Sequence, residues 1–205
     1  MDRTFILPGM GADSSMYQSK EYDNIKGVIF TDWPSYNGEK TIEDVAERII
    51  HQHKITNHDI VGGSSLGGII AIEIARKLEI KKILLIGSAT TPDKINSILK
   101  NLSIFVNITP LDLFKELSLK FNNDNRILEM FGNADSDFVR EMCNAVFLWK
   151  GLEGYKGEVC KIHGETDRVI YPDSDAHIIS NGGHLIAMTH SKLVADFIKK
   201  SRNGS

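Results

Sequence analysis

Short apolar runs alternate with helical patterns along most of this chain, and that alternation constrains its fold more than any other feature. Six such runs have the length and the boundaries of buried β-strands, and they occupy residues 4–7, 27–31, 59–63, 82–86, 158–163 and 177–180. Buried strands that are connected by helices form a parallel sheet with both faces covered. The sequence therefore predicts an α/β fold with a mostly parallel, doubly wound sheet of about six strands.

The stretches between these runs carry helix signals. Residues 41–44 read Thr-Ile-Glu-Asp, which is a capping box, and apolar side chains follow at helical spacing up to Ile50. Residues 66–78 are apolar on nearly every side, which predicts a buried helix. A further amphipathic pattern predicts a last helix that begins near Lys192.

Strand signals stop between residues 91 and 156. This stretch holds two helical patterns instead, one that begins at Thr109-Pro110 and one from about Asp135 to Trp149. A stretch of this length is too long for a bare loop in a compact domain. We therefore expect residues 91–156 to form a helical cap, inserted into a core domain made of residues 1–90 and 157–205.

Composition argues against several classes of function. The chain has 24 basic and 27 acidic residues, a formal net charge of −3, and it has no long basic run, so nucleic acids and anionic membranes are poor partners. Two cysteines are too few for a disulfide framework, and the N-terminus lacks the apolar region of a signal peptide. No apolar run approaches the length of about 18 residues that a membrane span needs. We expect a cytoplasmic protein without a membrane span, and its oligomeric state is left open.

A short glycine-rich motif lies between an expected strand and an expected helix. Gly63-Ser64-Ser65-Leu66-Gly67 has the pattern G-x-S-x-G, and the positions of the two glycines select Ser65 as its centre. A sharp turn there has no room for side chains beside the central residue, and it lifts the Ser65 hydroxyl above the sheet edge. The Leu66 N–H and the positive end of the helix dipole would stabilise an oxyanion at that point. The alternative interpretation of this motif is a glycine-rich turn whose serines have no catalytic role.

A serine hydroxyl needs a base and an orienting acid before it becomes a good nucleophile. His184 lies in a glycine-containing loop directly after the last expected strand, at the sheet edge where α/β proteins bind ligands, and is our candidate for the base. Asp167 follows the preceding strand and is our candidate for the acid, with Glu165 and Asp173 as lesser candidates. His163, at the end of its strand, is interpreted as a packing or hydrogen-bonding residue.

These motifs together resemble the α/β-hydrolase-fold serine hydrolases, and the resemblance covers nearly the whole chain. The segment 63–67 is similar to the nucleophile elbow of that family, the segment 163–167 to its H-G-x-x-D acid segment, and Gly183-His184 to its terminal G-H. The order Ser65, Asp167, His184 along the chain is also the order of the family.

The resemblance implies an activity and further site residues. It implies a serine hydrolase, carboxylesterase-like, that cleaves small or medium esters through an acyl-enzyme on Ser65 and needs no metal or organic cofactor. Pro8-Gly9-Met10-Gly11 stands where the family carries H-G-x-G, so the Met10 N–H would be the second oxyanion donor beside that of Leu66. Two features depart from the family: its first two strands are missing, and Pro8 replaces the customary histidine.

Two other interpretations compete with ester hydrolysis. Residues 9–14, with Asp32 about 20 residues further on, come close to a dinucleotide-binding fingerprint, although Ser14 replaces its third glycine. Members of the α/β-hydrolase fold also include lyases, synthases and ligand-binding proteins that keep the three site residues. The sequence does not separate these from a hydrolase.

The expected cap is rich in large apolar side chains. A cap has little core of its own, so some of these side chains should face the catalytic cleft, although packing is the commoner role of aromatic residues at helical spacing. The candidates for substrate binding are Phe114, Phe138, Met142 and Trp149. This inventory favours a small-molecule ester with an apolar acyl or alcohol part.

Overall fold

Six parallel strands form one sheet in the order β2-β1-β3-β4-β5-β6. The protein is seen here in a computed structural model that describes residues 3–23, 25–96 and 134–203. The strands are β1 (Thr4–Leu7), β2 (Val28–Phe30), β3 (Ile60–Ser64), β4 (Lys82–Ile86), β5 (Glu158–Gly164) and β6 (His177–Ile179). The prediction of a mostly parallel α/β sheet of about six strands is confirmed.

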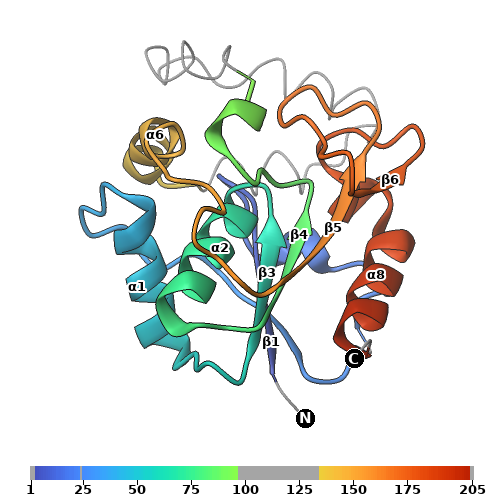
Figure 1. The fold of residues 1–205 in the computed structure, drawn as a ribbon, viewed down its shortest axis with the longest axis horizontal. Helices are drawn as coiled ribbons and strands as arrows, with labels where there is room; N and C mark the ends of the chain where they lie inside the picture. Colours follow the sequence, from blue (N-terminus) through green and yellow to red (C-terminus); the bar gives the residue numbers. More distant parts are fainter. Residues whose placement is uncertain (1–2, 24, 97–133, 204–205) are drawn as a thin grey trace.

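The helices cover both faces of this sheet (Figure 1). They are α1 (Ile42–His53), α2 (Leu66–Leu78), α6 (Ser136–Ala145), α7 (Ile186–Thr189) and α8 (Ser191–Asn203), with short 3-10 helices η1 (Ser14–Tyr17) and η2 (Pro92–Lys94). One buried cluster joins the sheet to α1, α2 and α6, and a second joins its other face to η1, α7 and α8. Along β1, Phe5 and Leu7 belong to the first cluster and Ile6 to the second, as the two-residue period of a strand requires.

Local sequence signals account for the two helices that lie against β3 and its neighbours. Thr41 Oγ1 accepts a hydrogen bond from the Asp44 N–H, and the Asp44 carboxylate accepts one from the Thr41 N–H, so the predicted capping box begins α1. Helix α2 contacts α1, β3 and β4, which explains why its sequence is apolar on nearly every side.

The helix expected over residues 135–149 is shorter than predicted, because α6 ends at Ala145. After it, the N–H groups of Phe147 and Leu148 bond to carbonyls three residues back, which tightens the chain into turns. Trp149 is still buried, so the apolar spacing correctly marked buried positions but placed the helix end too late.

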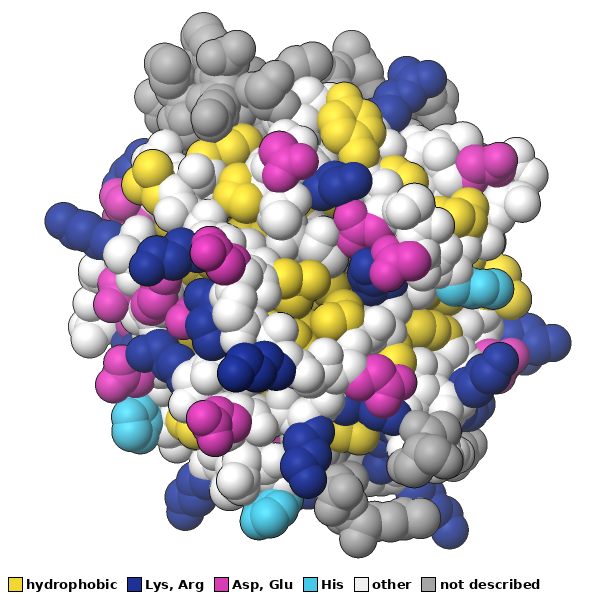
Figure 2. All heavy atoms as spheres, viewed as in Figure 1, with side chains coloured by type: hydrophobic (Ala, Val, Ile, Leu, Met, Phe, Trp, Pro, Cys, Tyr) yellow, Lys and Arg dark blue, Asp and Glu magenta, His cyan; other side chains and the backbone are white. Residues whose placement is uncertain are grey.

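Much of the expected cap lies outside the described residues, including the predicted helix start at Thr109-Pro110 and the candidate Phe114. The division into a core and a cap at residues 91–156 therefore stays a prediction. Across residues 3–23, 25–96 and 134–203, no helix has both the length and the hydropathy to cross a membrane. On the face drawn in Figure 2, acidic and basic side chains of the described residues are interspersed.

Candidate active site

Ser65 lies at the sharp turn between β3 and α2, with φ 50° and ψ −118°. A residue with a side chain rarely adopts this conformation, so the surrounding structure must hold it. The Ser65 N–H donates to the carbonyl of Ile86 at 3.1 Å, and the Ser88 hydroxyl donates to the Ser65 carbonyl at 2.7 Å. The end of β4 thus fixes both sides of the strained residue.

The glycines around Ser65 allow the backbone segments to approach closely. A Cβ atom added at Gly63 would overlap the backbone of Gly67, and one added at Gly67 would overlap the carbonyl oxygens of Leu7 and Pro8. A side chain at either position would push the turn after β1 away from the start of α2. The pattern G-x-S-x-G is therefore a packing requirement of this turn.

Two close contacts connect the Ser65 hydroxyl to a buried carboxylate. His184 Nε2 lies 2.9 Å from Ser65 Oγ, and His184 Nδ1 lies 2.8 Å from Asp167 Oδ2. An ionised carboxylate can only accept, so Nδ1 carries the proton and Nε2 of the neutral ring can accept from the serine hydroxyl. Ser65 follows β3, Asp167 follows β5 and His184 follows β6, and the parallel sheet brings these three strand ends to one edge.

Asp167 accepts hydrogen bonds on both carboxylate oxygens. Oδ1 accepts from the N–H groups of Val169 and Ile170 at 2.8 and 3.0 Å, and Oδ2 accepts from His184 and from His163. Burial opposes ionisation of Asp167, but the charge interaction with His184 and these hydrogen bonds outweigh it, so the pKa of Asp167 lies well below its ordinary value. The carboxylate is thus held ionised and in a fixed orientation.

This lowered pKa makes a prediction about stability at acid pH. Asp167 ionises more readily in the folded than in the unfolded chain, so its contribution is fully present above the unfolded pKa of about 3.9 and is lost as the pH falls toward the folded pKa. Between about pH 5 and pH 3, urea unfolding should show a larger loss of the free energy of unfolding for the wild type than for Asp167→Asn. Parallel losses in the two proteins would contradict this account.

His163 is a site residue whose contact with Asp167 the sequence interpretation did not identify. Its Nε2 lies 3.0 Å from Asp167 Oδ2 and 2.9 Å from the carbonyl of Ile170, and the ring is almost completely buried. Both partners are acceptors, so Nε2 carries a proton and donates. The available signal was the spacing of four residues between His163 and Asp167, which lets one turn fold back on the strand end.

The two lesser candidates for the acid make other contacts. The Glu165 carboxylate accepts from the Asn181 N–H at 3.0 Å and so holds the loop that carries His184. Asp173 accepts from the Thr90 hydroxyl at 2.8 Å and pairs with Lys161 and Lys94. Of the three acids considered from the sequence, Asp167 is the one that contacts His184.

The His184 loop packs tightly on the end of β5. The carbonyl of Gly182 accepts from both the N–H and the hydroxyl of Thr166, at 2.8 and 2.9 Å. A Cβ atom at Gly164 would overlap the carbonyls of Gly182 and Gly183, so only glycine at residue 164 lets this loop approach. These contacts set the height of the imidazole above the sheet.

The two expected oxyanion donors lie on either side of the turn at Ser65. Leu66 is the first residue of α2, and Met10 follows Gly9, whose added Cβ would lie 3.8 Å from the Cβ of Ser65. Neither the Met10 N–H nor the Leu66 N–H donates a hydrogen bond to another residue that the structure describes. The Met10 sulfur also lies 3.5 Å from the sulfur of Cys143 on α6.

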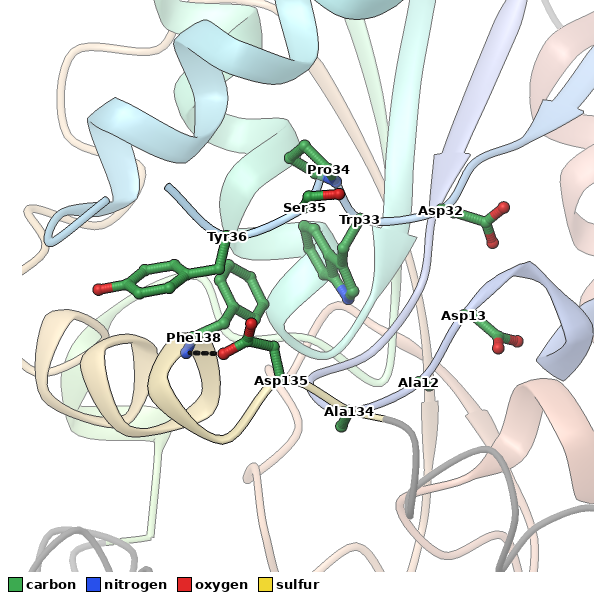
Figure 3. Close-up of a pocket in the computed structure, with 11 residues that line it drawn as sticks. Ala12, Asp13, Asp32, Trp33, Pro34, Ser35, Tyr36, Ala134, Asp135 and Phe138 are labelled. Atoms are coloured by element: carbon green, nitrogen blue, oxygen red, sulfur yellow. Dashed lines mark hydrogen bonds between the residues drawn. The ribbon is translucent and has the colours of Figure 1, made fainter. Parts of the chain in front are cut away.

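All three described candidates for substrate binding are buried in the same core cluster. Met142 and Trp149 are 0% and 4% exposed and belong to the core cluster beneath α6, which is the packing role left open from the sequence. Phe138, which is 5% exposed and belongs to the same cluster, also lines a cleft of about 360 Å³, drawn in Figure 3. Trp33 and Tyr36 line the same cleft, and the sequence interpretation did not identify them.

The dinucleotide-binding alternative is not supported by the path of the chain. The turn after β1 leads into η1, a 3-10 helix of four residues, whereas the fingerprint requires the N-terminus of a longer helix to hold a pyrophosphate. The Asp32 carboxylate accepts a hydrogen bond from the Ser14 N–H at 2.7 Å and so stabilises this turn.

Comparison with known proteins identifies the fold. No family model and no curated protein matches the sequence. Among solved structures, a hydrolase from Pseudomonas aeruginosa PA01 has a TM-score of 0.78 and 13% identity, over 99% of this chain and 91% of that one. A hydrolase from Oleispira antarctica has a TM-score of 0.77 and 16% identity, over 100% and 92% of the two chains.

An enol-lactonase from Burkholderia xenovorans LB400 has a TM-score of 0.71 and 18% identity, over 97% of this chain and 92% of that one. At these identities the likeness concerns the fold alone. The chain has the α/β-hydrolase fold.

Proposed function

We propose that this protein is a serine hydrolase that cleaves carboxylic esters through an acyl-enzyme on Ser65. The observation that carries the proposal is the continuous set of contacts from Ser65 Oγ through His184 to the ionised, buried Asp167. A neutral imidazole between a hydroxyl and a carboxylate is the arrangement that activates serine in acyl transfer.

In the acylation step, Ser65 Oγ attacks the carbonyl carbon of the ester and His184 Nε2 takes the hydroxyl proton. The Asp167 carboxylate stabilises the resulting imidazolium and keeps its Nδ1–H directed inward. When the tetrahedral intermediate collapses, the bond to the leaving alcohol breaks and His184 returns the proton to the alcohol oxygen. The products of this step are the free alcohol and an acyl group on Ser65.

Two backbone N–H groups are proposed to stabilise the tetrahedral oxyanion. The Met10 and Leu66 N–H groups flank Ser65, and both are free of other described hydrogen-bond partners. Removal of one such donor typically costs about 3 kcal/mol of transition-state stabilisation. Water then attacks the acyl carbon with His184 as base, which releases the acid and regenerates Ser65.

The proposed substrate is a small or medium ester with an apolar part. The cleft near the Gly9–Gly11 turn supports this, because Trp33, Tyr36 and Phe138 supply aromatic surface there. Apart from the ester and water, every step above uses only side chains and backbone groups of this chain, so the proposal requires no metal or organic cofactor.

Labelling with a fluorophosphonate, followed by mass mapping of the adduct, tests the proposal directly. We expect phosphonylation of Ser65, turnover of aryl esters, and oxygen from isotopically labelled water in the released acid. Turnover without incorporation of that oxygen would instead indicate a lyase, and an unmodified Ser65 would reject the activated serine.

His163 provides a prediction about the pH dependence of turnover. His163→Leu removes one donor from Asp167 Oδ2, so the carboxylate becomes more basic and holds the imidazolium of His184 more strongly. The acid limb of the pH profile of kcat/KM should therefore move to higher pH, with a fall of about tenfold near neutral pH. His163→Gln, which keeps an N–H donor, should recover part of the loss.

Tyr22→Phe is the matched control for this measurement. It also removes a buried hydrogen bond, from the Tyr22 hydroxyl to the carbonyl of Ala187 at 2.6 Å, but it does not touch Asp167. Its pH profile should keep the wild-type position. A shift of equal size in both variants would mean that His163 acts only through stability.

A further inference from the structure

Three aromatic side chains line the cleft beside the turn after β1. Trp33 and Tyr36 follow β2, and Phe138 extends from α6. The ring centroid of Phe138 lies 5.3 Å from that of Trp33 and 6.3 Å from that of Tyr36. In Figure 3 the indole of Trp33 lies between the rings of Tyr36 and Phe138 on one side and the carboxylates of Asp13 and Asp32 on the other.

Three carboxylates line the cleft, and among the lining residues that the structure describes there is no lysine or arginine. Asp13, Asp32 and Asp135 each accept backbone N–H hydrogen bonds through Oδ1. Their Oδ2 atoms accept no hydrogen bond from any residue in the described part of the chain, and no described cation pairs with them. Within the described residues, each carboxylate therefore has one oxygen that is not used by the protein.

The charged side chains just outside the cleft are three carboxylates and Arg140, and Glu39 among them pairs with Arg48 at 2.6 Å. The pKa of the Tyr36 hydroxyl is raised, first by desolvation and then by the nearby charges of Glu141, Asp137 and Glu39, while Arg140 acts in the opposite sense. Arg140 itself pairs with Asp137 at 2.6 Å. An anionic group in this cleft would be repelled, and a cationic group would be attracted.

The cleft is connected to the candidate nucleophile through one turn. The Trp33 indole N–H donates to the carbonyl of Gly9 at 3.0 Å, and an added Cβ on Gly9 would lie 3.8 Å from the Cβ of Ser65. Gly11, two residues after Gly9, is part of the cleft wall. The Gly9–Gly11 turn therefore forms part of the cleft wall on one side and packs near Ser65 on the other, while the described lining of the cleft does not include Ser65 or His184.

We propose that this cleft binds a positively charged ammonium group of the substrate, so that cationic esters are the preferred substrates. The aromatic faces of Trp33 and Tyr36 attract such a cation through their quadrupoles, and the free carboxylate oxygens add charge attraction. The aromatic surface also favours the methyl groups of a quaternary ammonium over a bare, strongly hydrated ion. The statement about ester substrates rests on the proposed function, whereas binding of the cation does not.

Binding of choline, compared with its uncharged carbon isostere in which a tert-butyl group replaces the trimethylammonium group, tests the cation site directly. Calorimetry and tryptophan fluorescence need no turnover, and Trp33 is the more exposed of the two tryptophans. We expect choline to bind about tenfold more tightly than the isostere. Equal affinities, or tighter binding of the isostere, would overturn the proposal.

Variants that remove a negative charge but keep its hydrogen bonds test where choline binds. Asp32→Asn and Asp135→Asn, combined, keep an Oδ1 acceptor for the turn and for the N-terminus of α6, so the fold should be retained. The double variant should lose most of the preference for choline. Asp196→Asn, which removes an exposed charge from α8 on the other face of the sheet, should keep it.

Variants of Tyr36 separate the aromatic contribution from packing. Tyr36→Phe retains a ring and should keep the preference for choline, whereas Tyr36→Leu should reduce it several-fold. Equal effects of the two substitutions would remove the aromatic part of the proposal.

Rates of ester cleavage separate this proposal from the proposed function. The kcat/KM for a choline ester should exceed that for the matching ester of the carbon isostere by about tenfold. Equal cleavage of both esters would reject the cation site and leave the hydrolase. Tight choline binding with cleavage of neither ester would support the cation site and reject ester hydrolysis.

Discussion

Ser65→Ala should lower kcat/KM for an activated aryl ester by about 10⁴-fold or more, because no other group in the proposed mechanism can form the acyl-enzyme. The residual rate should come from the oxyanion donors and from substrate binding alone. Alanine occupies the strained turn no better and no worse than serine, so the thermal midpoint should change little. Initial rates and a thermal melt on the same preparation check both expectations.

Ser64→Ala is the matched control for that variant. The Ser64 hydroxyl lies 2.8 Å from the hydroxyl of Tyr17 and is buried, whereas the Ser65 hydroxyl lies next to His184. We expect Ser64→Ala to keep its turnover within about tenfold of the wild type. Near-normal activity of Ser65→Ala, or an equally large loss in Ser64→Ala, would overturn the assignment of the nucleophile.

Asp167→Asn should have the second largest effect, a fall in kcat of about 10³- to 10⁴-fold. An asparagine amide can donate to His184 Nδ1, which would leave the proton of a neutral imidazole on Nε2, where it cannot accept from Ser65. The loss should appear mainly in kcat, because Asp167 is buried and acts on the reaction through its contact with His184.

Glu165→Gln tests whether this loss is specific to Asp167. Glu165 holds the backbone of Asn181 in the same loop, and a glutamine oxygen can still accept that hydrogen bond. We expect Glu165→Gln to lower kcat by less than about tenfold. The opposite ranking of the two variants would assign the acid to Glu165.

The sequence by itself determined the architecture, because the spacing of apolar residues along the chain shows which positions of a strand or a helix are buried. The short apolar run of β1 and the capping box at Thr41 depend only on neighbouring residues, and the structure contains both. Gly63 and Gly67, on either side of Ser65, are also a local signal, because a turn this sharp excludes side chains at these two positions.

Only the tertiary structure decided which polar groups meet. Ser65 and His184 are separated by 119 residues, and their contact depends on the order of the strands and on the height of the glycine loop above β5. The spacing of residues along the chain does not encode either quantity. For the same reason, the contact of His163 with Asp167 Oδ2 could be identified only in the folded structure.

The cleft is the clearest product of the tertiary structure. Trp33 comes from the loop after β2 and Phe138 from α6, more than a hundred residues later in the chain, and neither position is marked by a motif. Helical spacing grouped Phe138 with Met142 and Trp149 as candidates, and all three are buried in one core cluster, yet it could not show that Phe138 also lines a cleft. Periodicity reports how deeply a residue is buried, whereas the packing of distant elements decides whether it faces a neighbour or a ligand.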